Sequence, residues 1–190
     1  VALREVPMQN AEKSARQVYE NILKSFPDLN IQLDARLELA ELLATRDEHP
    51  AAIKLLQEAL EGDREPAAEL LEKIKLRLAA CQLDQATRVL LSANAALANR
   101  ATKPDARTQA EADAKKARET IESAMEQVQA ISGNDKSKLW QQAVYREAEC
   151  LLQLGKSDEA IKLLARFRDD GKFHNLPGLT DRALLRLGAA

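Results

Sequence analysis

The string Ala52-Ile53-Lys54-Leu55-Leu56 recurs letter for letter as Ala160-Ile161-Lys162-Leu163-Leu164. A looser copy, Ala86-Thr87-Arg88-Val89-Leu90, begins 34 residues after the first. The residues that precede the two identical strings correspond as well: Ala35, Ala40, Glu41 and Leu43 align with Ala143, Ala148, Glu149 and Leu151. Repetition at this spacing indicates a chain built from copies of one structural unit.

The apolar spacing within each copy is helical. Leu39, Leu42 and Leu43 recur at intervals of three and four residues, which places them on one helix face. Aromatic residues make up only 3% of the chain, so the 45% apolar content is mainly Leu and Ala, which favour helices. We therefore predict an all-α protein of about nine helices, over Gln9–Phe26, Gln32–Thr45, Pro50–Glu61, Pro66–Cys81, Asp84–Asn99, Asp105–Ile131, Lys136–Leu154, Ser157–Arg168 and Thr180–Ala190.

Each unit thus consists of a helix, a short turn and a second helix. A single hairpin cannot bury its apolar stripe, and stacking on the next hairpin buries the rest. Gly62 and Gly155 stand where helices are expected to end, and Pro50 and Pro66 where helices begin.

The small residues of these units resemble those of the tetratricopeptide repeat, a 34-residue helix–turn–helix unit. Its small positions 8 and 20 are Ala40 and Ala52 in one unit and Ala148 and Ala160 in another. The resemblance implies a right-handed superhelical solenoid of antiparallel hairpins spanning 1–190 as one array. Its units are 8–30 (partial), 33–66, 67–100, an irregular long helix at 101–135, 141–174 and 179–190 (partial). Because both ends fall inside a unit, we expect a fragment of a longer array of bacterial type.

Some positions depart from the family pattern. Ile74, Arg77 and Cys81 occupy positions 8, 11 and 15 of the unit 67–100, and Phe167 replaces a small residue in the unit 141–174. The resemblance covers about two thirds of the chain, and the segment 101–135 has none of the pattern. That segment is interpreted either as an elongated helix projecting into solvent or as a helix for docking or self-association.

In this family the first helix of each hairpin lines a concave groove that binds a peptide or protein partner. By resemblance, the groove residues are Asp34, Leu37, Glu41, Ala44 and Thr45, then Ala68, Leu71, Lys75, Leu78 and Ala79, then Gln142, Tyr145, Glu149, Leu152 and Gln153. The alternative for the leucines is packing between hairpins. Glu41 and Glu149 in this groove would repel an acidic peptide end, so we do not expect that partner.

Composition excludes other classes of function. With 28 basic and 30 acidic side chains the net charge is −2, so the basic excess of a nucleic-acid binder is missing. No apolar run approaches the ~20 residues that a membrane-spanning helix needs. The sequence leaves the compartment open between cytoplasm and periplasm.

No catalytic or cofactor motif is present. The chain has neither a GxGxxG nor a GxxxxGK[ST] motif, and Cys81 and Cys150 form no CxxC pair. We interpret the cysteines as small buried apolar residues, with a disulfide as the alternative. His49 and His174 are interpreted as surface turn residues rather than metal ligands. The expected function is therefore a protein–protein interaction scaffold without enzymatic activity, cofactor or metal; the alternative is a structural segment that self-associates into homo-oligomers.

Overall fold

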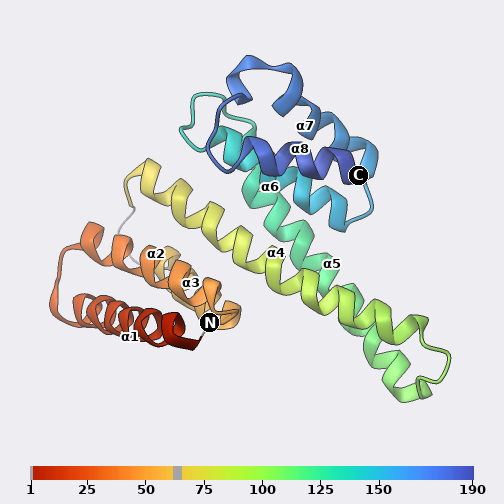
Figure 1. The fold of residues 1–190 in the computed structure, drawn as a ribbon, viewed down its shortest axis with the longest axis horizontal. Coiled ribbons are helices and arrows are strands. Elements are labelled where there is room, and N and C mark those ends of the chain that lie inside the picture. The colour runs from red at the N-terminus through yellow and green to blue at the C-terminus, as the bar shows by residue number, and fades with distance from the viewer. Residues whose placement is uncertain (1, 62–65) are drawn as a thin grey trace. The chain divides into compact units, whose positions relative to one another are not determined.

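The computed structural model of the chain describes residues 2–61 and 66–190, with side chains from Glu12 onward. These residues form eight α-helices and one short 3-10 helix, and no strand (Figure 1). The elements are α1 (Ala2–Ser25), α2 (Leu29–Thr45), α3 (His49–Leu60), α4 (Ala68–Ala98), α5 (Pro104–Ser132), α6 (Trp140–Gln153), α7 (Ser157–Asp169), η1 (Gly171–Phe173) and α8 (Thr180–Ala189). The all-α prediction is confirmed. None of these helices combines the length and the apolar character that crossing a bilayer requires.

Local signals account for the starts of three helices. Asp28 caps α2, because its Oδ1 accepts a hydrogen bond from the Ile31 backbone N–H at 3.0 Å. Pro50 and Pro104 each stand in the first turn of a helix, where a missing N–H costs nothing. Gly62, which we expected to end the third predicted helix, lies outside the described residues.

The predicted break between Cys81 and Asp84 is wrong. We expected a hairpin there, but α4 runs without interruption from Ala68 to Ala98. No Gly or Pro lies within α4, and every residue between Cys81 and Asp84 is compatible with a helix. The capping preference of Asp84 alone does not end a helix, so the described residues contain eight helices where about nine were expected.

The chain packs as two compact units, residues 1–81 and 82–190, and α4 contributes to both. In unit 1, α1, α2, α3 and the first part of α4 enclose an apolar core. Its buried members are Leu33, Leu39, Ala40, Leu43, Ala52, Leu56, Ala59, Ile74, Leu78 and Cys81. Ala40 and Ala52 are fully buried, since small side chains allow α2 and α3 to approach closely.

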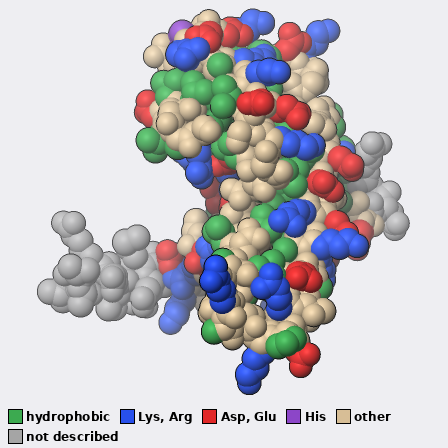
Figure 2. Space-filling view, turned by 90° about the vertical axis from the view of Figure 1, so that its right-hand side faces the viewer, with side chains coloured by type: hydrophobic (Ala, Val, Ile, Leu, Met, Phe, Trp, Pro, Cys, Tyr) green, Lys and Arg blue, Asp and Glu red, His purple; other side chains and the backbone are tan. Residues whose placement is uncertain are grey.

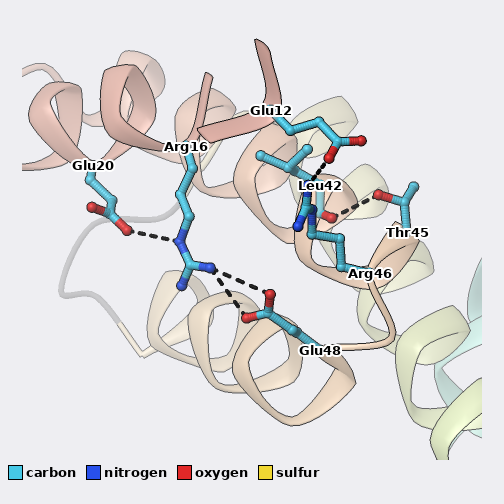
Figure 3. Close-up of polar contacts among 7 residues, drawn as sticks. All are labelled: Glu12, Arg16, Glu20, Leu42, Thr45, Arg46 and Glu48. Carbon is cyan, nitrogen blue, oxygen red and sulfur yellow. Dashed lines mark hydrogen bonds and ion pairs between the residues drawn. The ribbon is translucent and has the colours of Figure 1, made fainter. Parts of the chain in front are cut away.

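Polar contacts join α1 to the α2–α3 turn (Figure 3). The Arg16 guanidinium donates to Glu20 within α1 at 3.1 Å and reaches Glu48, just before α3, at 3.3 Å. Arg46 at the end of α2 pairs with Glu12 of α1. These side chains are partly exposed, so each ion pair contributes at most about 1 kcal/mol.

Unit 2 contains two apolar clusters. One lies among α6, α7, η1 and α8, where the rings of Trp140 and Phe167 each lie 4.8 Å from that of Phe173. The other joins α5 to the second part of α4 and to Cys150 of α6. The buried residues of α5 are Ala110, Ala114, Ala117, Ile121, Ala124, Val128 and Ile131. One face of α5 is therefore buried along most of its length, although Ala106 near its start is exposed. The interpretation of α5 as a helix projecting into solvent is wrong, since it packs against its neighbours.

The α2–α3 and α6–α7 hairpins have the same turn. Asp47 and Gly155 both adopt left-handed backbone conformations, with φ of 64° and 75°. The Asp47 N–H donates to Ala44 O, and the Gly155 N–H donates to Leu152 O, both at 3.1 Å. In both hairpins the next residue also donates its backbone N–H, at 2.9 Å, to the carbonyl oxygen of the residue five positions before it. The repeated strings therefore correspond to repeated local structure, one copy in each unit.

Candidate functional site

In unit 1 the predicted groove residues differ in accessibility. Asp34, Glu41 and Thr45 on α2 are exposed, whereas Leu78 on α4 belongs to the core. Leu37, Leu71 and Lys75 are half-buried, and Leu37 packs against the core. The Glu41 carboxylate accepts a hydrogen bond from Arg77 at 2.6 Å. Leu78 is therefore closed to a partner, because its side chain fills space between the helices of unit 1.

In unit 2 all five predicted groove residues lie on α6 (Trp140–Gln153), and Leu152 among them is half-buried. Gln142 is exposed and Gln153 half-buried, but Tyr145 is only 2% exposed and Glu149 only 8%. The Tyr145 ring packs edge-on against Phe167, with centroids 6.3 Å apart. Tyr145 is thus a core residue whose hydroxyl reaches a polar cluster, and its ring presents little surface to a partner.

Glu149 is the centre of that polar cluster. Its Oε1 accepts a hydrogen bond from the Tyr145 hydroxyl at 2.9 Å, and its Oε2 accepts one from Arg146 Nη1 at 2.7 Å. Arg186 of α8 places Nη2 at 3.8 Å from Oε1. Burial, together with the neighbouring Glu149 charge, raises the pKa of Tyr145 above its ordinary value. The carboxylate is therefore buried with its charge compensated, as such groups must be.

A small polar cavity of about 70 Å³ lies beside this cluster. Side chains of three helices line it: Leu83, Asp84 and Thr87 of α4, Glu149, Leu152 and Gln153 of α6, and Arg186 of α8. We call these residues, with Gln142 and Arg182, the α6/α8 face. The cavity has room for about two water molecules, at ~30 Å³ each. It is far smaller than the ~300–1,000 Å³ typical of small-molecule sites. Its size suits the tip of one side chain.

A second concavity runs between α4 and α5 and is here called the α4–α5 groove. Two adjoining hollows of about 490 and 300 Å³ form it, and both are lined by Val89 and Asp113. The other lining residues are Arg88, Ser92, Ala93, Ala96, Ala106, Gln109 and Ala110 in the larger hollow, and Gln85, Ala86, Lys116, Ala117 and Thr120 in the smaller. Alanine side chains are too short to fill the space between two helices, so an apolar groove remains.

The surface at the end of the α4–α5 hairpin is not dominated by one charge. Figure 2 shows this side, where basic, acidic and apolar side chains are interspersed. A basic stripe of the kind that tracks a nucleic-acid backbone is not visible on this face.

Groups suited to metal or thiol chemistry are not assembled in the described part of the chain. No cluster of three or more His, Cys, Asp or Glu side chains that could hold a metal ion occurs among those residues. Cys81 and Cys150 are buried and are not joined by a disulfide, and burial raises the pKa of Cys150 to about 12. A thiol with so high a pKa is a poor nucleophile at neutral pH.

The interpretation of His49 as a surface turn residue is wrong. His49 begins α3 and is only 4% exposed, with its Nε2 at 3.8 Å from Asp47 Oδ1. Its ring nitrogens have no hydrogen-bond partner among the described residues. His174, after η1, is exposed as expected.

Sequence reasoning missed the arginines of α8. Arg182 and Arg186 are four residues apart and lie against Tyr145 and Glu149 of α6. A signal was present, since aligning Ala183 with Ala143 places Arg182 at the groove position that Gln142 occupies. No family model, no curated protein and no solved structure matches this chain. The tetratricopeptide resemblance therefore rests on the residues quoted above.

Proposed function

We propose that this protein is a scaffold that binds a peptide segment of a protein partner on the α6/α8 face. The observation that carries the proposal is the convergence of α4, α6 and α8 on one polar cavity. Thr87, Gln153 and Arg186 there offer hydrogen-bonding groups that are not fully buried. The buried Glu149 carboxylate accepts hydrogen bonds from Tyr145 and Arg146, so this part of α6 is organised before a partner arrives.

A helical repeat architecture of the tetratricopeptide kind, wound as a right-handed solenoid, belongs to the same proposal. The identical turn bonds of the α2–α3 and α6–α7 hairpins support it, as do the fully buried Ala40, Ala52, Ala148 and Ala160 at equivalent positions. In such an array the first helices of successive hairpins present one continuous surface to a partner. The role proposed is binding rather than catalysis, because the cavity is smaller than typical small-molecule sites.

Site-specific photo-crosslinking in cells of the source tests the proposal. A photoreactive phenylalanine analogue replaces Gln153 on the face, or Lys162 on α7 as the control, because Lys162 is exposed and lines no described cavity. We expect one protein to crosslink at position 153 and not at 162, and the purified pair to bind each other. Equal crosslinking at both positions, or none at 153, would refute a binding role for this face.

The α4–α5 groove favours a second candidate function, self-association with another copy of this chain. Its apolar floor and mixed rim of Arg88, Asp113 and Lys116 allow opposite charges to meet when two identical surfaces face each other. Val89, 39% exposed, lines both hollows, whereas Leu91, 63% exposed, lines neither. If copies pair here, Val89→Glu abolishes the dimer in sedimentation while Leu91→Glu preserves it. A monomer at all concentrations would eliminate this function.

A further inference from the structure

Two arginines on α8 point their guanidinium groups at α6. The Arg182 guanidinium carbon lies 5.4 Å from the centroid of the Tyr145 ring, and Arg186 Nη2 lies 3.8 Å from Glu149 Oε1. Arg146 of α6 adds a third guanidinium, hydrogen-bonded to Glu149 at 2.7 Å. Residues four apart on a helix lie on the same side, so Arg182 and Arg186 form one cationic pair.

The positive charge of this cluster exceeds the negative charge beside it. Arg146 and Arg186 lie against the carboxylate of Glu149, Arg182 lies over the Tyr145 ring, and the cavity adds only the carboxylate of Asp84. Three positive charges against two negative ones leave one in excess. Moreover, no described carboxylate forms an ion pair with Arg182, and the 3.8 Å contact of Arg186 is longer than a hydrogen bond. Each guanidinium has five N–H donors, so both retain donors for an incoming acceptor.

Glu149 does not act as a free negative charge on this face. Each of its oxygens accepts a hydrogen bond within the protein, and the residue is 8% exposed. The reason given from sequence for excluding an acidic partner therefore does not apply to unit 2. Arg182 and Arg186 are exposed, so their guanidinium groups keep N–H donors available to a partner.

We propose that the partner segment bound by the α6/α8 face is acidic, and that Asp or Glu side chains of that segment bind Arg182 and Arg186. This inference rests on the proposed function and specifies its partner. Arginine forks match carboxylates with two parallel hydrogen bonds. Two acidic side chains about 6 Å apart, the spacing of four residues on a helix, would engage both arginines.

The test measures binding of fluorescein-labelled octaglutamate to the whole chain by fluorescence anisotropy, with octaglutamine as the uncharged probe. We expect the Arg182→Gln/Arg186→Gln double variant to bind octaglutamate about tenfold more weakly than the parent, and Arg182→Lys/Arg186→Lys to recover part of the loss. The matched control is Arg118→Gln/Lys162→Gln, which removes the same charge from exposed positions on α5 and α7. It should change the affinity less than about twofold, because distant surface charges are screened. Circular dichroism verifies that all variants are folded.

Several outcomes would overturn the inference: equal weakening by the control variant, equal binding of octaglutamine, no binding of octaglutamate, or displacement by inorganic phosphate at equal charge concentration. The last would assign the arginines to a small anion instead of a peptide. If these results occur while position 153 still crosslinks to a partner, the acidic partner is refuted and the binding function survives. If position 153 crosslinks to nothing, the proposed function itself fails.

Discussion

Replacing Tyr145 by Phe removes one hydroxyl from the Glu149 cluster and leaves the ring packing against Phe167 intact. The lost hydrogen bond runs from the Tyr145 hydroxyl to Glu149 Oε1 over 2.9 Å, between two buried residues. A hydrogen bond to a charged group contributes about 1.5–3 kcal/mol to stability. Glu149 keeps its bond from Arg146, so its charge is not left unpaired. We therefore expect the lower end, about 1.5 kcal/mol.

Urea unfolding followed by Trp140 fluorescence measures this loss. Trp140 is the only tryptophan in the chain and lies in the core of unit 2, 4.8 Å from the Phe173 ring, so its signal reports on the unit that contains Tyr145. With m-values of about 1–3 kcal/mol/M, the midpoint should fall by roughly 0.5–1.5 M. Tyr19→Phe is the matched control, because Tyr19 is half-buried in unit 1 and should leave the Trp140 transition unchanged.

A double-mutant cycle that combines Tyr145→Phe with Glu149→Gln measures the interaction free energy between the two side chains. The reasoning is refuted if Tyr145→Phe changes the free energy of unfolding by less than about 0.5 kcal/mol, or if the two substitutions are additive.

Alkaline pH gives an independent check. Because the pKa of Tyr145 is raised in the folded state, its contribution is complete below pH ~10 and is lost as pH rises through the folded pKa. The difference between the parent and the Phe variant should therefore shrink in that range.

Three further predictions concern the backbone and the buried thiol. Gly155→Ala should destabilise unit 2 by about 1 kcal/mol, because φ is 75° there and strains an alanine although space around the new Cβ is open. Gly188→Ala in α8 should instead stabilise the protein by about 0.5 kcal/mol. Equal changes in the urea midpoint of the two variants would contradict this expectation. Gln82→Pro should destabilise by about 3 kcal/mol or more, measured by circular dichroism, because it interrupts α4; a turn at this point would tolerate the proline. Because the pKa of Cys150 is raised to about 12, its stabilising contribution should be complete below pH ~9 and should be lost as pH rises further. Cys150→Ala should therefore flatten the decline of unfolding free energy between about pH 9 and about 12. An unchanged slope of unfolding free energy against pH would refute this prediction.

Part of the candidate site follows from the sequence. Repeat register placed Gln142, Glu149 and Gln153 on one helix, and Glu149 and Gln153 do line the cavity. Register alone could not distinguish a residue on the groove side from one packed beneath it. Tyr145 is buried because the Phe167 ring and α8 cover it, and both come from parts of the chain more than twenty residues away.

The sequence by itself determined features whose causes are local. The three- and four-residue apolar spacing produced helices, and the glycine at 155 permitted the left-handed turn that Asp47 also adopts. The tertiary structure decided that α4 continues past Asp84. The cap signal at Asp84 is weak, and packing against neighbouring elements stabilises the helix on both sides of it. The tertiary structure alone brought Arg182 and Arg186 to Tyr145 and Glu149. Which charges meet depends on the packing of α8 beside α6, and packing is a property of contacts between distant residues.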